Sequence, residues 1–141
     1  MSRQQGKFRL SELEGRIAVI TGAGNFGIGW GLAKYAALNL HMHIVLIDLH
    51  RAAVEQAAAE LRAVDPDLQV LALACDVTSS ANLASALEQI DDAFAGISVG
   101  AVFANAGVIF NNSILKSEIE DWETTLNVNV LGIVKTIKAF V

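Results

Sequence analysis

Short apolar runs that alternate with longer stretches of helical periodicity constrain the fold of this chain more than any other feature. The four runs, which predict strands, lie at residues 16–21, 43–48, 69–75 and 99–104. The stretches that predict helices lie at residues 30–38, 51–64, 81–94 and from about 119 to the last residue, with an irregularity near Gly132. Strands that alternate with helices pair in parallel through right-handed crossovers. The sequence therefore predicts an α/β fold with a parallel sheet between layers of helices.

A glycine-rich turn at residues 22–29 joins the first predicted strand to the first predicted helix. Gly22, Gly27 and Gly29 let the backbone turn tightly and approach a pyrophosphate closely. The helix that begins near Ile28 would offer free N–H groups and the positive end of its dipole to the same group. Glycines are also common in ordinary loops, but the position between a strand and a helix favours a dinucleotide site.

Asp48 ends the second predicted strand, 26 residues after Gly22. A carboxylate at this position can accept hydrogen bonds from the hydroxyls of the adenosine ribose and would repel a 2′-phosphate, so NAD is favoured over NADP. Arg51 lies nearby and could partly offset that repulsion. The alternative is that Asp48 caps the helix that follows it.

Composition and charge exclude several other classes of protein. The chain has 141 residues, 53% of them hydrophobic, which is enough for one domain with a buried core. Fifteen acidic and ten basic residues give a net charge of −5, and the basic residues are scattered, so a nucleic-acid partner is not expected. No apolar stretch is long enough to span a bilayer, and the N-terminus does not resemble a signal peptide. The single cysteine favours a reducing, cytoplasmic location.

The cysteine and histidine content argues against a metal site. The single cysteine, Cys75, excludes an internal disulfide and a cysteine-based zinc cluster, and it is predicted to pack in a strand. His41, His43 and His50 lie near the second predicted strand without the carboxylate or cysteine spacing of a metal site. We therefore expect no bound metal.

Four motifs occur along the chain in a fixed order. They are Thr-Gly-Ala-Gly-Asn-Phe-Gly-Ile-Gly at 21–29, Asp-Val at 76–77, Ala-Asn-Ala-Gly at 104–107 and Asn-Val-Asn-Val-Leu-Gly at 127–132. With these motifs the chain resembles the short-chain dehydrogenase/reductase family over residues 15–132. The resemblance implies a Rossmann-type doubly wound parallel sheet of about four strands in the order 3-2-1-4. It also implies hydride transfer between a nicotinamide cofactor and a carbonyl or secondary alcohol.

The resemblance also assigns roles to individual residues. Asp76 and Val77 are expected to contact the adenine ring, and Asn129 is expected to be the catalytic asparagine of the family. Asn127 is the competing choice, and a mid-helix asparagine can instead bond a carbonyl one turn back. The predicted cofactor-binding residues are Gly22, Asn25, Gly27, Ile28, Gly29, Asp48, Asp76, Val77, Asn105, Ala106 and Gly107.

Two departures from the family pattern affect these expectations. The glycine loop has four residues between Gly22 and Gly27 where the family has three, so the pyrophosphate turn is expected to bulge and the family's contacts are not transferred directly to Gly24, Asn25 and Phe26. The catalytic Ser and the Tyr-x-x-x-Lys pair of the family normally follow the helix in which this sequence ends. The single tyrosine, Tyr35, belongs to the first predicted helix and is expected to pack there.

We therefore expect residues 1–14 to form a polar arm and residues 15–141 to form a truncated NAD(P)-binding domain that ends before the family's Ser and Tyr-x-x-x-Lys. Such a chain would bind NAD, with NADP less favoured, and would act on an alcohol or carbonyl substrate only if completed. The alternatives are a non-catalytic dinucleotide-binding module and a subunit that needs a second polypeptide. The apolar last helix favours association into a homo-oligomer.

Overall fold

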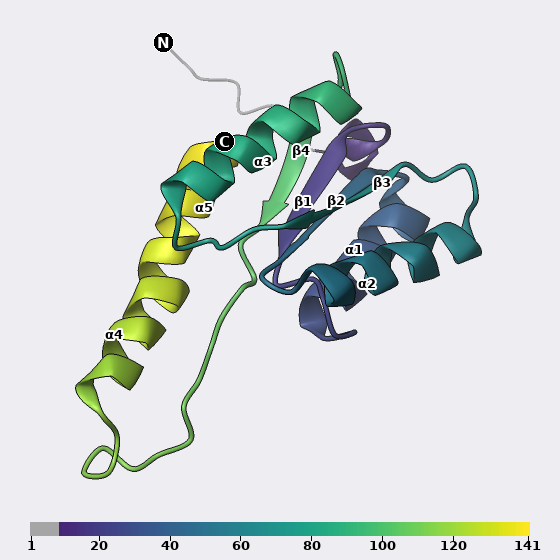
Figure 1. The fold of residues 1–141 in the computed structure, drawn as a ribbon. Helices are drawn as coiled ribbons and strands as arrows, with labels where there is room; N and C mark the ends of the chain where they lie inside the picture. The colour runs from purple at the N-terminus through teal and green to yellow at the C-terminus, as the bar shows by residue number, and fades with distance from the viewer. Residues whose placement is uncertain (1–8) are drawn as a thin grey trace.

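Residues 9–141 are described by the computed structural model, in which four parallel strands form one sheet (Figure 1). The strands are β1 (Ile17–Thr21), β2 (His43–Asp48), β3 (Val70–Ala74) and β4 (Val99–Phe103). The helices are α1 (Ile28–Leu40), α2 (Arg51–Val64), α3 (Ser80–Ala93), α4 (Ile119–Leu126) and α5 (Ile133–Phe140). The order of the strands in the sheet is β3-β2-β1-β4, so the predicted order 3-2-1-4 and the predicted α/β fold are confirmed.

The centre of the sheet is buried between two layers of helices. Helices α1 and α2 cover one face, and α3 and α5 cover the other (Figure 1). Because side chains alternate along a strand, Ala18 and Ile20 face α1 and α2, whereas Ile17 and Val19 face α3 and α5. Burial on both faces explains why the strand sequences are apolar at successive positions.

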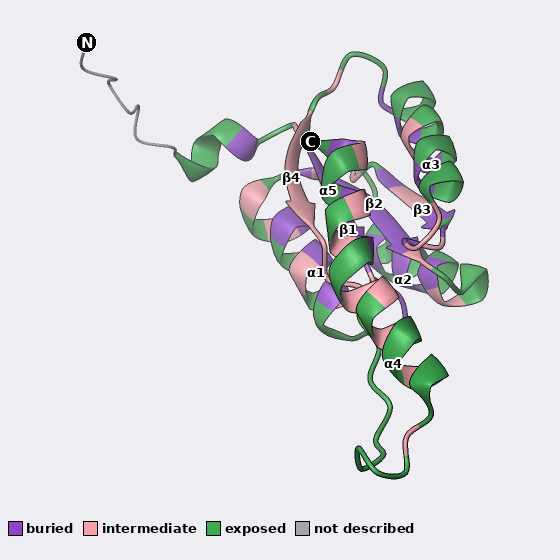
Figure 2. Ribbon diagram, turned by 90° about the vertical axis from the view of Figure 1, so that its left-hand side faces the viewer, coloured by how far each residue is buried: buried purple, intermediate pink, exposed green. Residues whose placement is uncertain are grey.

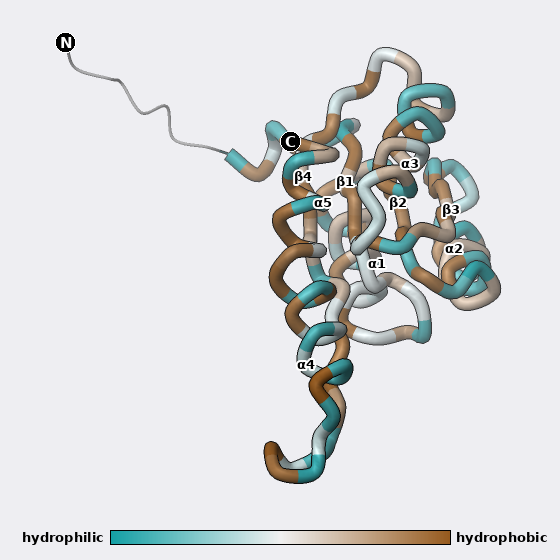
Figure 3. Tube along the Cα trace, turned by 60° about the vertical axis from the view of Figure 1, so that its left-hand side comes forward, coloured by the Kyte–Doolittle hydropathy of each residue, from teal (hydrophilic) through white to brown (hydrophobic). Residues whose placement is uncertain are grey.

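The last part of the chain is much less buried than the sheet. Helix α4 and the loop before it extend away from the sheet and are mostly exposed (Figure 2). Among residues 9–141, β4 pairs only with β1, and its residues are only half-buried. Figure 3 shows that much of α5 is hydrophobic although part of its surface faces solvent. Within residues 9–141, no helix is long and apolar enough to cross a membrane.

The predicted final helix begins at Ile119 as expected, but it is not one continuous α-helix. A π-helical segment, η2 (Asn127–Gly132), separates α4 from α5. A Cβ atom on Gly132 would lie 3.0 Å from Cγ2 of Val77, so a larger residue here would require the side chain of Val77 to shift. The irregularity predicted near Gly132 therefore extends over the six residues that end at Gly132.

The beginning of the chain is described only in part. Residues 1–8 of the predicted polar arm lie outside the described residues. The short 3-10 helix η1 (Leu10–Leu13) follows, and its Leu13 is buried in the same core cluster as α1. Part of the segment predicted as a polar arm thus packs on the domain.

Candidate functional site

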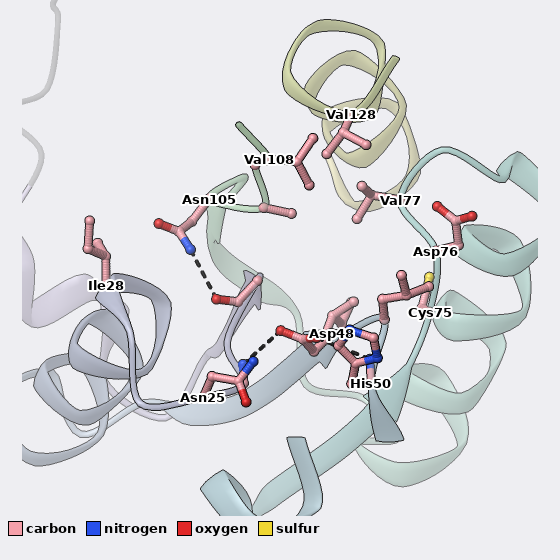
Figure 4. A pocket seen from close by; sticks show the side chains of 16 residues that line it. Asn25, Ile28, Asp48, His50, Cys75, Asp76, Val77, Asn105, Val108 and Val128 are labelled. Atoms are coloured by element: carbon pink, nitrogen blue, oxygen red, sulfur yellow. Dashed lines mark hydrogen bonds between the residues drawn. The ribbon is translucent and has the colours of Figure 1, made fainter. Parts of the chain in front are cut away.

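The carboxyl ends of the four strands surround a cavity of about 440 Å³ (Figure 4). In an open parallel sheet, ligands bind at this edge, where the strand order reverses. Here that point lies between β1 and β4. The residues that line the cavity are Gly22, Gly24, Asn25, Ile28, Ile47, Asp48, Leu49, His50, Cys75, Asp76, Val77, Asn105, Ala106, Gly107, Val108 and Val128.

Most of the predicted site residues meet at this cavity, and three do not. Gly27 and Gly29 belong to the same loop and helix but do not line it, and neither does Asn129, although its neighbour Val128 does. The lining residues that the sequence did not single out include His50 and Val108. Both lie within two residues of a predicted position, so they could have been predicted from their place beside the motifs.

Two glycines of the loop are required by the packing of the protein itself. Gly22 has a φ of +64°, and a Cβ atom on it would lie 2.8 Å from Cα of Ala106. A Cβ atom on Gly29 would overlap the carbonyl oxygen of Gly22. These contacts let the first turn of α1 lie directly against the end of β1, beside the start of the segment after β4.

Gly27 differs from Gly22 and Gly29. It precedes the first residue of α1 with φ −81° and ψ −158°, a conformation that any residue adopts. A Cβ atom there would have no heavy atom of the described residues within 4 Å. The packing of residues 9–141 therefore gives no reason for a glycine at this position.

The expected bulge of the loop lies at Asn25 and Phe26. These residues have φ values of 55° and 52°, in the left-handed region that L residues rarely adopt. Asn tolerates this region better than most residues because its short polar side chain can hydrogen-bond locally. For Phe26 the conformation costs about 1–3 kcal/mol, so the extra residue of the loop is accommodated at the expense of stability.

Asn105 fastens the end of β4 to the end of β1. Its Nδ2 donates to the carbonyl oxygens of Thr21 at 3.0 Å and Gly22 at 3.2 Å. The backbone N–H of Ala106 donates to Oγ1 of Thr21 at 3.1 Å. Asn105 therefore shapes the wall of the cavity through its amide, in addition to lining the cavity.

Asp48 connects the end of β2 to the glycine loop. Its Oδ2 accepts a hydrogen bond from the backbone N–H of Gly24 at 2.9 Å, and its Oδ1 accepts from the N–H of His50 at 3.1 Å. The N-cap residue of α2 is His50, and its side chain makes no capping hydrogen bond. Asp48 does not occupy the cap position, so the alternative that Asp48 caps this helix is wrong. A carboxylate oxygen has more than one lone-pair site, so Asp48 can still accept hydrogen bonds from a ligand in the cavity.

Asp76 and Cys75 form the wall of the cavity at the end of β3. Oδ1 of Asp76 accepts hydrogen bonds from the backbone N–H of Thr78 at 2.8 Å and from its hydroxyl at 2.7 Å. Burial, and then the charge of Asp76, raise the pKa of the Cys75 thiol from 9.0 to about 11. The thiol is therefore protonated and unreactive at neutral pH.

Among the described residues, no group of three His, Cys, Asp or Glu side chains could hold a metal ion.

Asn129 fastens the loop after β4 to the π-helical segment. Its Oδ1 accepts from the backbone N–H of Val108 and its Nδ2 donates to the carbonyl oxygen of Val108, both at 2.8 Å. The alternative that this asparagine bonds a carbonyl one turn back is therefore wrong. Across residues 9–141, the side chain of Asn127 makes no such hydrogen bond, so Asn129 is the asparagine that positions the loop.

A second cavity, of about 320 Å³, lies between this loop and α4; it shares Val108 with the first cavity and is also lined by Asn129. Apolar side chains of Ile109, Phe110 and Trp122 line it together with Asp121. Trp122 is nearly half exposed, and its Nε1 donates to Oγ of Ser117 at 2.8 Å. The sequence did not predict this cavity, because it depends on how the loop and α4 lie against each other.

Comparison with known proteins places the chain in one family. Residues 16–141 match the family model described as short chain dehydrogenase. Human estradiol 17-beta-dehydrogenase 11 is 32% identical over 136 residues, which are 94% of this chain and 42% of that protein. The chain thus spans about two-fifths of the length of this relative.

Solved structures with the same fold include a complex with NAD and a complex with NADPH. A short chain dehydrogenase/reductase from Burkholderia phymatum in complex with NAD is 30% identical with a TM-score of 0.77, over 92% of this chain and 44% of that chain. L-sorbose reductase from Gluconobacter frateurii, complexed with NADPH and L-sorbose, is 26% identical with a TM-score of 0.78, over 91% of this chain and 47% of that chain.

Replacing Asn129 by Asp should lower the free energy of unfolding by about 1–3 kcal/mol, because a carboxylate cannot donate to the carbonyl oxygen of Val108. Urea denaturation followed by circular dichroism measures the change. The matched control is Asn127→Asp, which introduces the same charge two residues earlier and should cost less than about 0.5 kcal/mol. Equal losses in the two variants would contradict the assignment of Asn129 as the positioning asparagine.

Proposed function

Since the chain belongs to the short chain dehydrogenase family, we propose that its first cavity binds a nicotinamide dinucleotide and prefers NAD to NADP. We further propose that the chain is the cofactor-binding part of an oxidoreductase that acts on a carbonyl or secondary alcohol. The observation that carries this proposal is Gly27, a loop glycine that the packing of the described residues does not require. When bound, the dinucleotide would supply or accept the hydride.

The loop and the start of α1 have the properties that a diphosphate needs. The N-cap residue of α1 is Gly27, which has no side chain to occupy the free N–H groups of the first turn. The first turn also contains no acidic residue, so nothing there opposes an anion. The positive end of the helix dipole adds to the attraction. Gly22, Asn25, Ile28 and Gly29 would form the rest of this diphosphate site.

The opposite side of the cavity suits an adenosine. Asp48 would accept hydrogen bonds from the ribose hydroxyls, and Asp76 and Val77 would contact the adenine. Arg51, the cation that could offset the repulsion between Asp48 and a 2′-phosphate, forms an ion pair with Glu55 at 3.4 Å. NAD is therefore the favoured cofactor.

The residues after β4 would serve the nicotinamide side of the cavity. Asn105, Ala106 and Gly107 line it, and Asn129 holds the next residue, Val108, by both of its backbone groups. Tyr35, which was expected to pack, is instead exposed on α1, and it does not line the cavity. We propose that the proton-transferring Ser, Tyr and Lys that the family resemblance implies are supplied by residues outside this sequence.

Replacing Gly27 by Ala tests the dinucleotide site directly. The variant should fold normally, because the new methyl group meets no described atom, but the Kd for NADH should rise about tenfold as the methyl group occupies the diphosphate site. Titration of NADH fluorescence measures binding. The matched control is Gly31→Ala, also in open space on α1, which should leave the Kd unchanged. If both variants bind NADH equally well, Gly27 does not face the cofactor.

Removing the carboxylate of Asp48 tests the preference for NAD. Asp48→Ala should weaken NADH binding and lower the ratio of Kd for NADPH to Kd for NADH by about tenfold, since a negative charge no longer repels the 2′-phosphate. Both constants are measured by the same fluorescence titration. Glu60→Ala, an equal change of charge on the exposed side of α2, serves as control. An unchanged ratio in Asp48→Ala would rule out this basis for cofactor preference.

A specific observation also favours association with a second copy of the chain. Val130, Leu131, Val134 and Ile137 are each about half exposed and lie on η2 and α5. Helix α5 contacts β4, which pairs with no strand other than β1 among residues 9–141. Four large apolar side chains on one exposed helical segment are typical of an interface between proteins. We propose that this surface is covered by the same surface of another copy.

Val134→Lys should convert the associated form into a monomer, because the lysine would place a charge in the apolar contact. Light scattering coupled to size-exclusion chromatography measures the mass. Val64→Lys, at another half-exposed valine on α2, should leave the mass unchanged. A monomeric mass for the unmodified protein at micromolar concentration would contradict the proposed association.

A further inference from the structure

The proposed dinucleotide site does not explain Phe26. This residue adopts the left-handed conformation, with φ 52°, directly after Asn25 with φ 55°. Asn is common in this region, whereas a bulky aromatic residue there is rare. The extra residue of the glycine loop is therefore accommodated in a turn that local preferences do not stabilise. Contacts from outside the turn must hold it.

Phe26 makes such a contact with Trp30 on the first turns of α1. The two ring centroids are 5.3 Å apart and the planes meet at 79°, which is the edge-to-face arrangement that aromatic pairs prefer. Nζ of Lys34 lies 5.1 Å from the centre of the indole ring, and the same indole packs against the core between the sheet, α1 and α2. Phe26 is therefore attached to a side chain that is itself fixed.

Packing, rather than hydrogen bonding, fixes that indole. Within residues 9–141, Nε1 of Trp30 is shielded from solvent and has no hydrogen-bond partner. Its position therefore depends on the rings and apolar groups around it, among them Phe26. Loss of the ring of Phe26 would thus free both the turn and one side of the indole.

Adjacent residues of the turn face different sides. Asn25 lines the cavity, whereas Phe26 does not line it and contacts α1 instead. We propose that Phe26 is a positioning residue for cofactor binding, because its contact with Trp30 holds the left-handed turn in the form that binds the diphosphate. The proposal rests on the proposed function, since it concerns the same loop. If the contact is lost, the turn samples other conformations, and binding must order it again at a cost in affinity.

Binding of two probes to Phe26→Ala tests this role. NADH contains the diphosphate, whereas adenosine reaches only the side of the cavity formed by Asp48 and Asp76. The Kd for NADH, from fluorescence titration, should rise between about twofold and about tenfold, as the loss of one edge-to-face pair predicts. The Kd for adenosine, from a titration followed by two-dimensional NMR, should not change. The NMR spectra also report whether the variant is folded.

Three further variants separate the ring from other effects. Phe26→Tyr keeps the ring and should restore binding of NADH. Phe26→Gly removes the ring but also removes the strain of the left-handed conformation, and it should bind NADH as weakly as Phe26→Ala. Tyr35→Ala removes an exposed aromatic ring elsewhere on α1 and should leave both constants unchanged.

The outcomes distinguish this proposal from the function on which it rests. If the unmodified protein binds no NADH, the proposed function fails and this proposal fails with it. If the unmodified protein binds NADH and Phe26→Ala or Phe26→Gly binds it equally well, the positioning role alone is overturned. A parallel loss of adenosine binding in Phe26→Ala would also overturn it, because the effect would then be general rather than specific to the diphosphate.

Discussion

The close approach between the turn after β1 and the segment after β4 determines the shape of the cavity edge. Gly22 lies so near the backbone of Ala106 that no side chain fits between them, and the amide of Asn105 bonds the carbonyl oxygens of Thr21 and Gly22. These contacts bring together two strand ends that are more than eighty residues apart in sequence. Since the strand order reverses at this point, they also open the cavity in which a ligand can lie.

The other walls of the cavity depend on this junction through hydrogen bonds to backbone groups. Asp48 binds the N–H of Gly24 and so links the end of β2 to the loop. Asn129 binds both backbone groups of Val108 and so links the π-helical segment to the chain after β4. In each case one polar side chain fixes a loop whose backbone groups are not bonded within a helix or a sheet. The cavity is thus formed mainly by loops that are held at the edge of a rigid sheet.

The strands and helices could be predicted because local pattern and tertiary environment agree. The strand sequences are mostly apolar, and β1 at the centre of the sheet is buried at every position. The bulge in the glycine loop could also be expected from its one extra residue. Its conformation could not, since Phe26 adopts a backbone geometry that its residue type disfavours. Phe26 and Trp30 are close in sequence, but the contact between their rings is seen only in the structure.

The sequence by itself determined the alternation of strands and helices, the parallel sheet and the family to which the chain belongs, because each depends on residue types at fixed spacings. It also identified most of the residues around the first cavity, since these follow the strands directly. The tertiary structure alone decided that Asp48 binds the glycine loop instead of capping α2, that Asn129 rather than Asn127 holds the loop after β4, and that a second cavity lies beside α4. The physical reason is that a hydrogen bond needs its two partners within about 3 Å of each other, and for residues 20 or more positions apart only the folded chain sets that distance.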